Sequence, residues 1–394
     1  MDEQPKKKAK TISACANVDA DGSSVPRIQF ASTSAADFFA GFVSQRKPCV
    51  ILGHPGVPSA TTLRQEMEGL SDDCVVQLER RKHPGERFGQ ERSDDRQIDS
   101  NIATFVRDCY TDPVPEATKL LYLSTQSNPA EDTAAVGDDA PPPFFGPPCD
   151  RLTSIPRTPL PLAGHLRLDS CHLWMGVATK SHSGLHHDFH DNFYLLLSGQ
   201  KTFHLYPPFD APHVGVVGDV EYVHFNGLIS YRDSPTRADG KPATERRDEH
   251  GTRGDEDDEE AVVIGKGFDY QSDDDEEDDF DVPVEDFSDD EATELSDDPR
   301  SEIGNNFCWI DPTLPREKIL ETFPNYAKAT GSRVTLQAGE VLYLPASWFH
   351  CVVSEGSSPV SPVHMALNHW YTPPDNLENF QRPYTNHAYW HQAS

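Results

Sequence analysis

The stretch Leu185-His186-His187-Asp188-Phe189-His190-Asp191-Asn192, followed by the apolar residues 193–197, decides the fold of this chain. We predict a β-strand over residues 186–197. Side chains at positions i and i+2 of a strand point to the same face, so this strand directs the imidazole of His186 and the carboxylate of Asp188 towards one point. If the strand belongs to a barrel, that point lies inside it.

A second stretch supplies the third candidate ligand, namely Gly339-Glu340-Val341-Leu342-Tyr343-Leu344-Pro345-Ala346-Ser347-Trp348-Phe349-His350. A strand ends at its proline, and a short turn with two aromatic residues then leads to His350. Two histidines and one carboxylate form the facial triad of non-haem Fe(II) oxygenases, which leaves three coordination positions open for a cosubstrate and dioxygen. We therefore predict that His186, Asp188 and His350 are the metal ligands and the catalytic residues.

The specificity of this prediction comes from a combination of motifs. A His-x-Asp triplet alone is weak, because the chain has 17 histidines and 65 acidic residues. A hairpin lysine, Lys201, and the distal Pro-x-x-Trp-Phe-His make the pattern specific. His187 is expected to face the opposite side and to serve packing, whereas His190 shares the orientation of the ligands and is expected behind them or beside the substrate.

Strand-like segments lie on both sides of an acidic spacer, which indicates one barrel interrupted by an insertion rather than two domains. The sequence predicts strands over 47–53, 120–123, 171–177, 186–197, 201–206, 333–336, 341–344 and 365–371, and helices over 35–44, 102–109 and 314–326. The predicted class is therefore mainly β with flanking helices.

The spacer, predicted over 232–302, is strongly acidic. Residues 233–302 hold 29 Asp and Glu against 7 Lys and Arg, and so carry −22 of the net charge of −31. Apolar residues are too sparse there to offset the entropy of ordering the chain, so we expect disorder. The insertion is either a solvated spacer or a docking segment for basic proteins, and in the second case the barrel would be an inert scaffold.

Composition excludes several classes of protein. The 8 cysteines form no Cys-x-x-Cys pair, which argues against a zinc ribbon or a disulfide framework and favours a reducing compartment. No apolar run reaches the roughly 18 residues needed to span a bilayer, and the net charge of −31 argues against nucleic-acid binding through a basic surface. We expect a cytoplasmic or nuclear protein with a disordered basic tail over 1–24, in which Pro5–Lys10 is a nuclear import signal or a solvated run.

The chain resembles the JmjC-domain oxygenases of the cupin-8 type. The stretch Ser198-Gly199-Gln200-Lys201-Thr202-Phe203-His204-Leu205-Tyr206-Pro207-Pro208 is similar to the family's Gly-x-Lys strand, whose lysine binds the C5 carboxylate of 2-oxoglutarate. The resemblance assigns this role to Lys201, and a buried anion does need a fixed cation beside it. It covers 25–231 and 303–385 as two parts of one double-stranded β-helix (jelly-roll, cupin) barrel, and leaves 386–394 as a tail.

The resemblance also implies further contacts to 2-oxoglutarate from Ser183, Asn192, Tyr122 and Asn368. Ser183 stands where relatives often carry a threonine, and Tyr122 matches a tyrosine that contacts the same carboxylate as the lysine. The alternative for all four residues is hydrogen bonding within a packed barrel. The sequence departs from the family at Cys351 and His369, where relatives commonly carry His and Phe, and neither position is expected to be a ligand.

Within the family, the chain is most similar to the JmjC lysyl hydroxylases that act on developmentally regulated GTP-binding proteins. This similarity implies protein hydroxylation coupled to decarboxylation of 2-oxoglutarate to succinate and CO2, with Fe(II) as the metal and a GTP-binding or other basic protein as the substrate. Demethylation of a lysyl N-methyl group by the same iron is the alternative, and hydroxylation is preferred because no reader or zinc domain is visible. Cupin isomerases and cofactor-independent dioxygenases fit less well, since they lack the inward lysine. The oligomeric state is left open.

Overall fold

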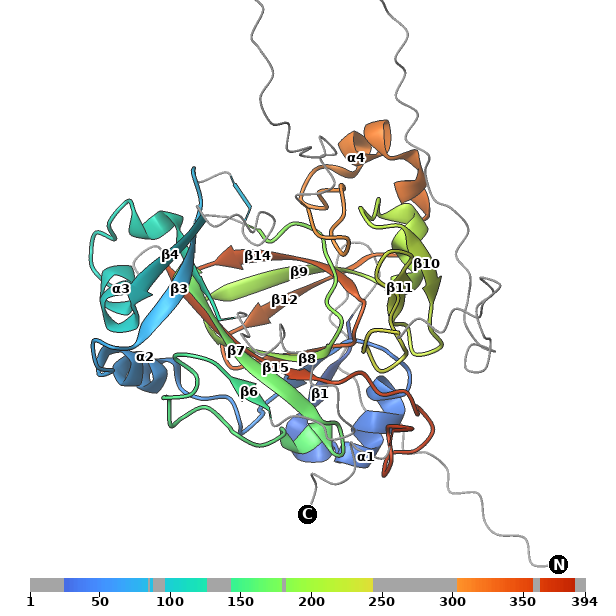
Figure 1. Ribbon diagram of the computed structural model, residues 1–394, viewed down its shortest axis with the longest axis horizontal. Helices are drawn as coiled ribbons and strands as arrows, with labels where there is room; N and C mark the ends of the chain where they lie inside the picture. Colours follow the sequence, from blue (N-terminus) through green and yellow to red (C-terminus); the bar gives the residue numbers. More distant parts are fainter. Residues whose placement is uncertain are drawn as a thin grey trace, which may run out of the picture.

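Two β-sheets face each other at the centre of the molecule, with helices α1, α2 and α3 on the outer side of the larger sheet (Figure 1). The computed structural model describes residues 25–83, 86–87, 96–125, 143–178, 182–243, 303–356 and 362–386. The predicted basic tail and the acidic blocks of the insertion lie outside the described residues, as does the C-terminal tail after residue 386.

The described chain contains fifteen strands and four α-helices. The strands are β1 Arg27–Gln29, β2 Cys49–Leu52, β3 Val75–Arg80, β4 Gln97–Asn101, β5 Leu121–Ser124, β6 Phe144–Phe145, β7 Leu168–Val177, β8 Asp191–Ser198, β9 Gln200–Tyr206, β10 Val220–Val223, β11 Ile229–Tyr231, β12 Ser332–Gln337, β13 Val341–Leu344, β14 Phe349–Glu355 and β15 Val363–Tyr371. The helices are α1 Ala35–Phe38, α2 Ala60–Glu68, α3 Ile102–Cys109 and α4 Arg316–Thr322.

The strand order shows one interleaved barrel. The larger, ten-stranded sheet has the order β1-β2-β13-β8-β15-β7-β5-β3-β4, with β6 beside β7, and the smaller sheet has the order β12-β9-β14. Strand β8 thus lies between β13 and β15, and β9 lies between β12 and β14, so that strands from both sides of the insertion alternate. This arrangement confirms the predicted cupin-type, jelly-roll barrel.

Alternation along the strands separates the barrel interior from the helix-covered face. On β8, Tyr194 and Leu196 belong to the same buried cluster as Phe203 and Leu205 of β9, which places this cluster between the two sheets. The intervening apolar residues of β8 belong to a second cluster that they form with the helices. The interior positions are therefore the even-numbered residues of β8 and the odd-numbered residues of β9.

The flanking helices begin at residues that cap them. Ser34, Ser59 and Asn101 each accept a hydrogen bond from a backbone N–H in the first turn of α1, α2 and α3, which satisfies donors that have no partner within the helix. Helix α1 continues as a wider π-helical turn over Phe39–Val43. Together they correspond to the single helix predicted over 35–44.

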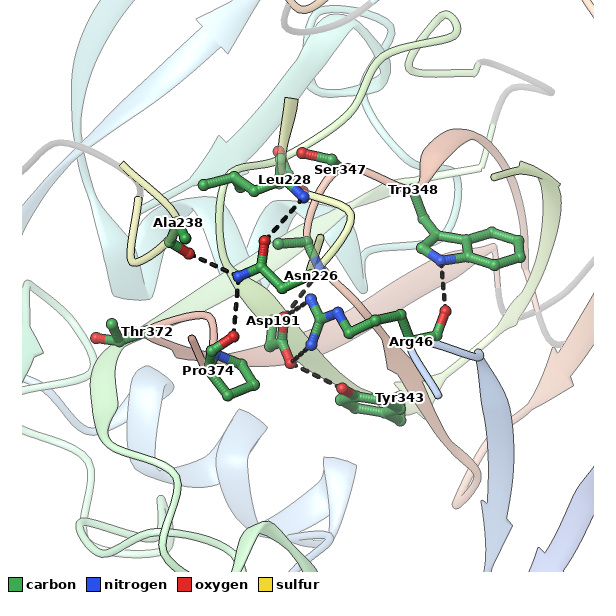
Figure 2. Close-up of polar contacts among 12 residues, drawn as sticks. Arg46, Asp191, Asn226, Leu228, Ala238, Tyr343, Ser347, Trp348, Thr372 and Pro374 are labelled. Carbon is green, nitrogen blue, oxygen red and sulfur yellow. Dashed lines mark hydrogen bonds and ion pairs between the residues drawn. The ribbon is translucent and has the colours of Figure 1, made fainter. Parts of the chain in front are cut away.

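The sequence prediction missed helix α2 and strands β1, β3, β4, β6, β10 and β11. Three further differences lie closer to the predicted ligands or to the insertion. Strand β8 begins at Asp191 rather than at His186, because residues 186–190 leave the larger sheet and run beside β14 instead. Strand β14 was not predicted, since its residues follow a proline turn. Residues 232–243, assigned to the insertion, are described and packed: Asn226 Nδ2 donates to the carbonyls of Ala238 and Pro374, at 2.6 and 2.8 Å (Figure 2).

The hairpin between β8 and β9 requires a glycine. Gly199 has a φ of +82°, and a Cβ atom there would lie 2.6 Å from the carbonyl oxygen of Glu355. Any other residue would have to displace the backbone of β14.

Among the described helices, none is long and apolar enough to cross a membrane.

Candidate metal centre

The three predicted ligands meet at one end of the smaller sheet. One ligand atom from each of His186, Asp188 and His350 lies within 4.8 Å of the other two, and His350 Nε2 is 3.5 Å from Asp188 Oδ2. No other group of three or more such ligands occurs in the described part of the chain. Two imidazoles and a carboxylate at these separations fit a divalent cation with open coordination positions.

Backbone pairing holds the two ligand segments together. The N–H of His186 donates to the carbonyl of His350 at 3.1 Å, and the N–H of His350 donates back at 2.6 Å. Such a reciprocal pair is the hydrogen-bonded register of an antiparallel ladder. His186 is therefore held by isolated antiparallel bridges to His350 and Phe307, and not by the long strand predicted over 186–197.

Each ligand imidazole is oriented by a backbone carbonyl. His186 Nδ1 lies 3.1 Å from the Gly184 carbonyl and His350 Nδ1 lies 2.9 Å from the Trp348 carbonyl. A carbonyl oxygen can only accept, so Nδ1 carries the hydrogen in both rings and the lone pair resides on Nε2. This arrangement is the usual support of metal-binding histidines.

The electrostatics of the centre favour an ionised carboxylate. Burial opposes ionisation of Asp188, but the neighbouring imidazoles of His350 and His186 outweigh it and lower the pKa of Asp188 below its usual value. His187 points the other way and is fully buried, with Nε2 2.6 Å from the hydroxyl of Tyr231. Burial lowers its pKa to about 3, so His187 is a neutral packing residue, as predicted.

A buried lysine lies inside the barrel on the neighbouring strand. Lys201 is 2% exposed, and its Nζ is 5.8 Å from the ring centroid of Tyr122 and 6.0 Å from that of Tyr194. Burial lowers the pKa of Lys201 to about 7, with no described carboxylate offsetting the effect. An ammonium group in this position favours an anionic ligand, because the anion would supply the missing counter-charge.

Several buried polar atoms at interior positions of the larger sheet have no hydrogen-bond partner among the described residues. They are Asn192 Oδ1, Asn368 Oδ1, Trp174 Nε1 and His364 Nδ1, on strands β8, β15, β7 and β15. Buried polar groups in proteins are normally hydrogen-bonded. The unpartnered indole N–H of Trp174, in the same interior as a buried ammonium, fits an anionic ligand that accepts hydrogen bonds, whereas the two amide oxygens fit a hydrogen-bond donor. Trp174 and His364 were not singled out from the sequence, which gives no signal of their orientation.

The other predicted contacts divide into two kinds. The Tyr122 ring lies 6.0 Å from that of Trp174 and 5.7 Å from that of His364, so Tyr122 belongs to the lysine end of the interior. The hydroxyl of Ser183, in contrast, accepts from the Val352 N–H at 3.1 Å and donates to the Gly184 carbonyl at 2.9 Å. The first of these bonds joins the ligand segment to β14, and the second lies within the ligand segment.

His190 lies outside the group of ligands, on the solvent side of the centre. Its ring stacks on Trp370 at a centroid distance of 5.6 Å and an angle of 6°. Its Nε2 is 3.6 Å from Asp169 Oδ2, and both side chains are about one-third exposed. The expected role of His190, behind the ligands or beside a substrate, stays a prediction.

Sequence reasoning missed a buried ion pair next to the ligand segment. Asp191 is fully buried at the start of β8 and forms an ion pair with Arg46, from the turn after α1, at 2.6 Å (Figure 2). The available signal was a carboxylate inside a run of apolar residues, because such a group is almost never buried without a cationic partner. The identity of that partner, 145 positions away, could not be read from the sequence.

Comparisons with known proteins agree with this geometry. Residues 35–377 match the Cupin_8 family, described as a cupin-like domain. The chain is 29% identical to "JmjC domain-containing protein 4" of Schizosaccharomyces pombe, over 94% of this chain and 89% of that protein. It is 29% identical to the human "Bifunctional peptidase and (3S)-lysyl hydroxylase JMJD7" and 26% identical to "JmjC domain-containing protein E" of Dictyostelium discoideum, in each case over 52% of this chain and 42% of the relative.

Proposed function

The chain belongs to the Cupin_8 family of cupin-like proteins, and we propose that this JmjC oxygenase uses Fe(II) and 2-oxoglutarate to hydroxylate a protein substrate. The observation that carries the proposal is the pairing of the His186, Asp188 and His350 triad with the buried ammonium of Lys201 in one barrel interior. A triad alone would fit many metal proteins. A triad with an uncompensated interior cation fits a metal and an anionic cosubstrate together.

The residues divide the work between two ends of the interior. His186, Asp188 and His350 would hold the iron, and Lys201 would bind the distal carboxylate of 2-oxoglutarate, with Asn192 and Asn368 supplying further polar contacts. The chemistry supplied by bound iron and 2-oxoglutarate is activation of dioxygen, with release of succinate and CO2. The protein keeps the two ligand imidazoles in the tautomer that leaves Nε2 available to the metal, and the ring of Phe307 stacks on that of His186.

The proposed target is a lysyl side chain of a protein. Support comes from the human relative, which is named as a (3S)-lysyl hydroxylase. The solvent side of the centre, where Trp370 and His190 are stacked, is the side from which such a side chain would enter. A GTP-binding protein or another basic protein is the proposed partner.

Succinate release is the direct test. The purified chain with Fe(II), ascorbate and 2-oxoglutarate should release succinate, and His186→Ala should abolish the release. His204→Ala is the matched control, because His204 faces outward on β9 and should leave turnover unchanged. Absence of succinate release from the wild-type chain, on its own and with every basic protein offered, would favour the scaffold alternative.

Mass spectrometry of tryptic peptides from cells with and without the gene then identifies the target. A gain of about 16 Da on lysine supports hydroxylation. Loss of a methyl group from lysine instead would establish demethylation by the same centre. Tight binding of 2-oxoglutarate that depends on Lys201 would exclude a cupin isomerase.

A further inference from the structure

The carboxylate of Asp191 accepts four hydrogen bonds from three residues. Arg46 donates from Nη1 to Oδ2 at 2.8 Å and from Nη2 to Oδ1 at 2.6 Å. The Tyr343 hydroxyl donates to Oδ2 at 2.7 Å and the Ala346 N–H donates to Oδ1 at 2.9 Å. Figure 2 shows this arrangement, in which the guanidinium and the phenol converge on one fully buried carboxylate.

The turn that follows Ala346 is fixed by the same group of residues. The Trp348 indole Nε1 donates to the Arg46 carbonyl at 2.9 Å, and the Ser347 N–H donates to the Asp188 carbonyl at 2.7 Å. The Ser347 hydroxyl accepts from the Ile229 N–H at 2.9 Å. Among described non-glycine residues, only Arg46 and Ser347 have a positive φ, of 50° and 63°. Such conformations persist where the surrounding contacts impose them, and both occur in this network.

These contacts connect one metal ligand to another without passing through the metal. Asp191 lies three residues after Asp188, and the turn held by Asp191 leads directly to His350. The Trp348 carbonyl, next to that turn, accepts from His350 Nδ1 at 2.9 Å. The path therefore runs from Asp188 through Asp191 and the 346–348 turn to the imidazole of His350.

We propose that the Arg46–Asp191 pair is a positioning device that sets the separation and orientation of Asp188 and His350 for metal binding. The inference rests on the proposed function, since it concerns how the triad holds its cation. A guanidinium suits the task because its planar fork fixes both carboxylate oxygens at once, whereas an ammonium group would fix only one direction. Arg46 and Asp191 are positioning residues, because neither contacts the atoms of the triad that would coordinate the metal.

Metal affinity measured apart from turnover tests the proposal. Co(II) is titrated into the full-length chain, and its ligand-field absorption reports both the dissociation constant and the coordination geometry. Arg46→Met should weaken Co(II) binding about 10- to 100-fold, as loss of the groups that orient metal ligands usually does, and should alter the absorption spectrum. Arg46→Lys should retain the fold but recover only part of the affinity, because it restores the charge without the fork.

The matched control is Arg27→Met, which removes another arginine–carboxylate pair. Arg27 Nη1 lies 2.6 Å from Glu340 Oε1, near the edge of the same sheet and without a contact to the ligand segments. The Arg27→Met variant should bind Co(II) with the dissociation constant and the absorption spectrum of the wild type. If Arg46→Met does not fold, Tyr343→Phe removes one donor to Asp191 while it keeps the packed ring, and should shift the spectrum in the same direction.

Two results would overturn the proposal. The first is a folded Arg46→Met or Tyr343→Phe chain with an unchanged Co(II) constant and spectrum. The second is an equal change in Arg27→Met, which would show a general effect of destabilisation. Failure of the wild-type chain to bind Co(II) or Fe(II) would instead refute the proposed function itself, and the positioning role with it.

Discussion

Buried charges are compensated on the helix-covered face of the larger sheet but not inside the barrel. On the helix-covered face, Asp191 is compensated by Arg46 and by two further hydrogen-bond donors. Inside the barrel, Lys201 has no compensating carboxylate among the described residues, and Asn192 and Asn368 each bury an oxygen without a partner. A fully satisfied network serves the protein's own structure, whereas an unsatisfied one marks the place where a ligand completes the site.

Breaking the compensated Arg46–Asp191 pair should have the largest effect on stability. Arg46→Met leaves the Asp191 carboxylate buried without its cation, so we expect a loss of about 3–5 kcal/mol in the free energy of unfolding. The double variant Arg46→Met/Asp191→Leu should recover most of that loss, because it removes both charges. Urea unfolding of the metal-free chain measures both values. Equal stabilities for the single variant and the wild type would contradict the comparison.

Removing the uncompensated charge of Lys201 should change the stability in the opposite direction. Lys201→Met should stabilise the metal-free chain by about 1–3 kcal/mol, since it eliminates an uncompensated polar group from the interior. The same change should weaken 2-oxoglutarate binding by roughly 1.5–3 kcal/mol, which is the typical contribution of a hydrogen bond to a charged group. Thermal unfolding and calorimetric titration measure the two effects. Lower stability in Lys201→Met would show that the ammonium is already compensated.

Binding of 2-oxoglutarate should also depend on pH. The pKa of Lys201 is about 7 in the free protein, so the ammonium is lost as the pH rises above that value. An anion binds the protonated form, and its dissociation constant should therefore rise by up to about tenfold per pH unit above pH 7, until the pKa of the complex is reached. Titration of the Mn(II)-loaded chain between about pH 6 and about pH 9 measures this slope. Lys201→Met should show weak binding with no such slope.

The smallest effect is expected at Ser183. Its hydroxyl bonds only to backbone groups of the ligand segment and of β14, at Gly184 and Val352. Ser183→Ala should cost about 1 kcal/mol in stability, the usual net value of one such bond, and should leave the KM for 2-oxoglutarate nearly unchanged. A large rise in that KM would instead support the direct cosubstrate contact that the family resemblance implies.

The sequence was sufficient for the barrel and for the ligand set because both are encoded by short patterns. Helix α3 was predicted with its observed limits, and so was strand β13, since apolar periodicity and a preceding turn mark both elements. Prediction of the triad required only a local pair of residues at positions i and i+2 and one distant histidine. The inward orientation of Lys201 was predicted from the resemblance to the family's Gly-x-Lys strand.

Contacts between distant segments could not be predicted in the same way. The limits of β8 depend on where residues 186–190 transfer from one sheet to the other, and that transfer is determined by pairing with β14. The partner of Asp191 lies in another part of the chain, and no local pattern identifies it. Residues 232–243 looked like part of the insertion because they are polar, yet Asn226 binds them through the backbone carbonyl of Ala238, a contact that composition does not reveal.

The interleaved strand order has a consequence for how this protein is made. Strands β8 and β9 leave the ribosome well before β12 to β15, which are the strands that pair with them. At a synthesis rate of about 5–20 residues per second, these strand edges stay unpaired for several seconds. Unpaired edges promote aggregation, and charge opposes it. The nascent chain acquires most of its negative charge, in residues 233–302, during this same interval.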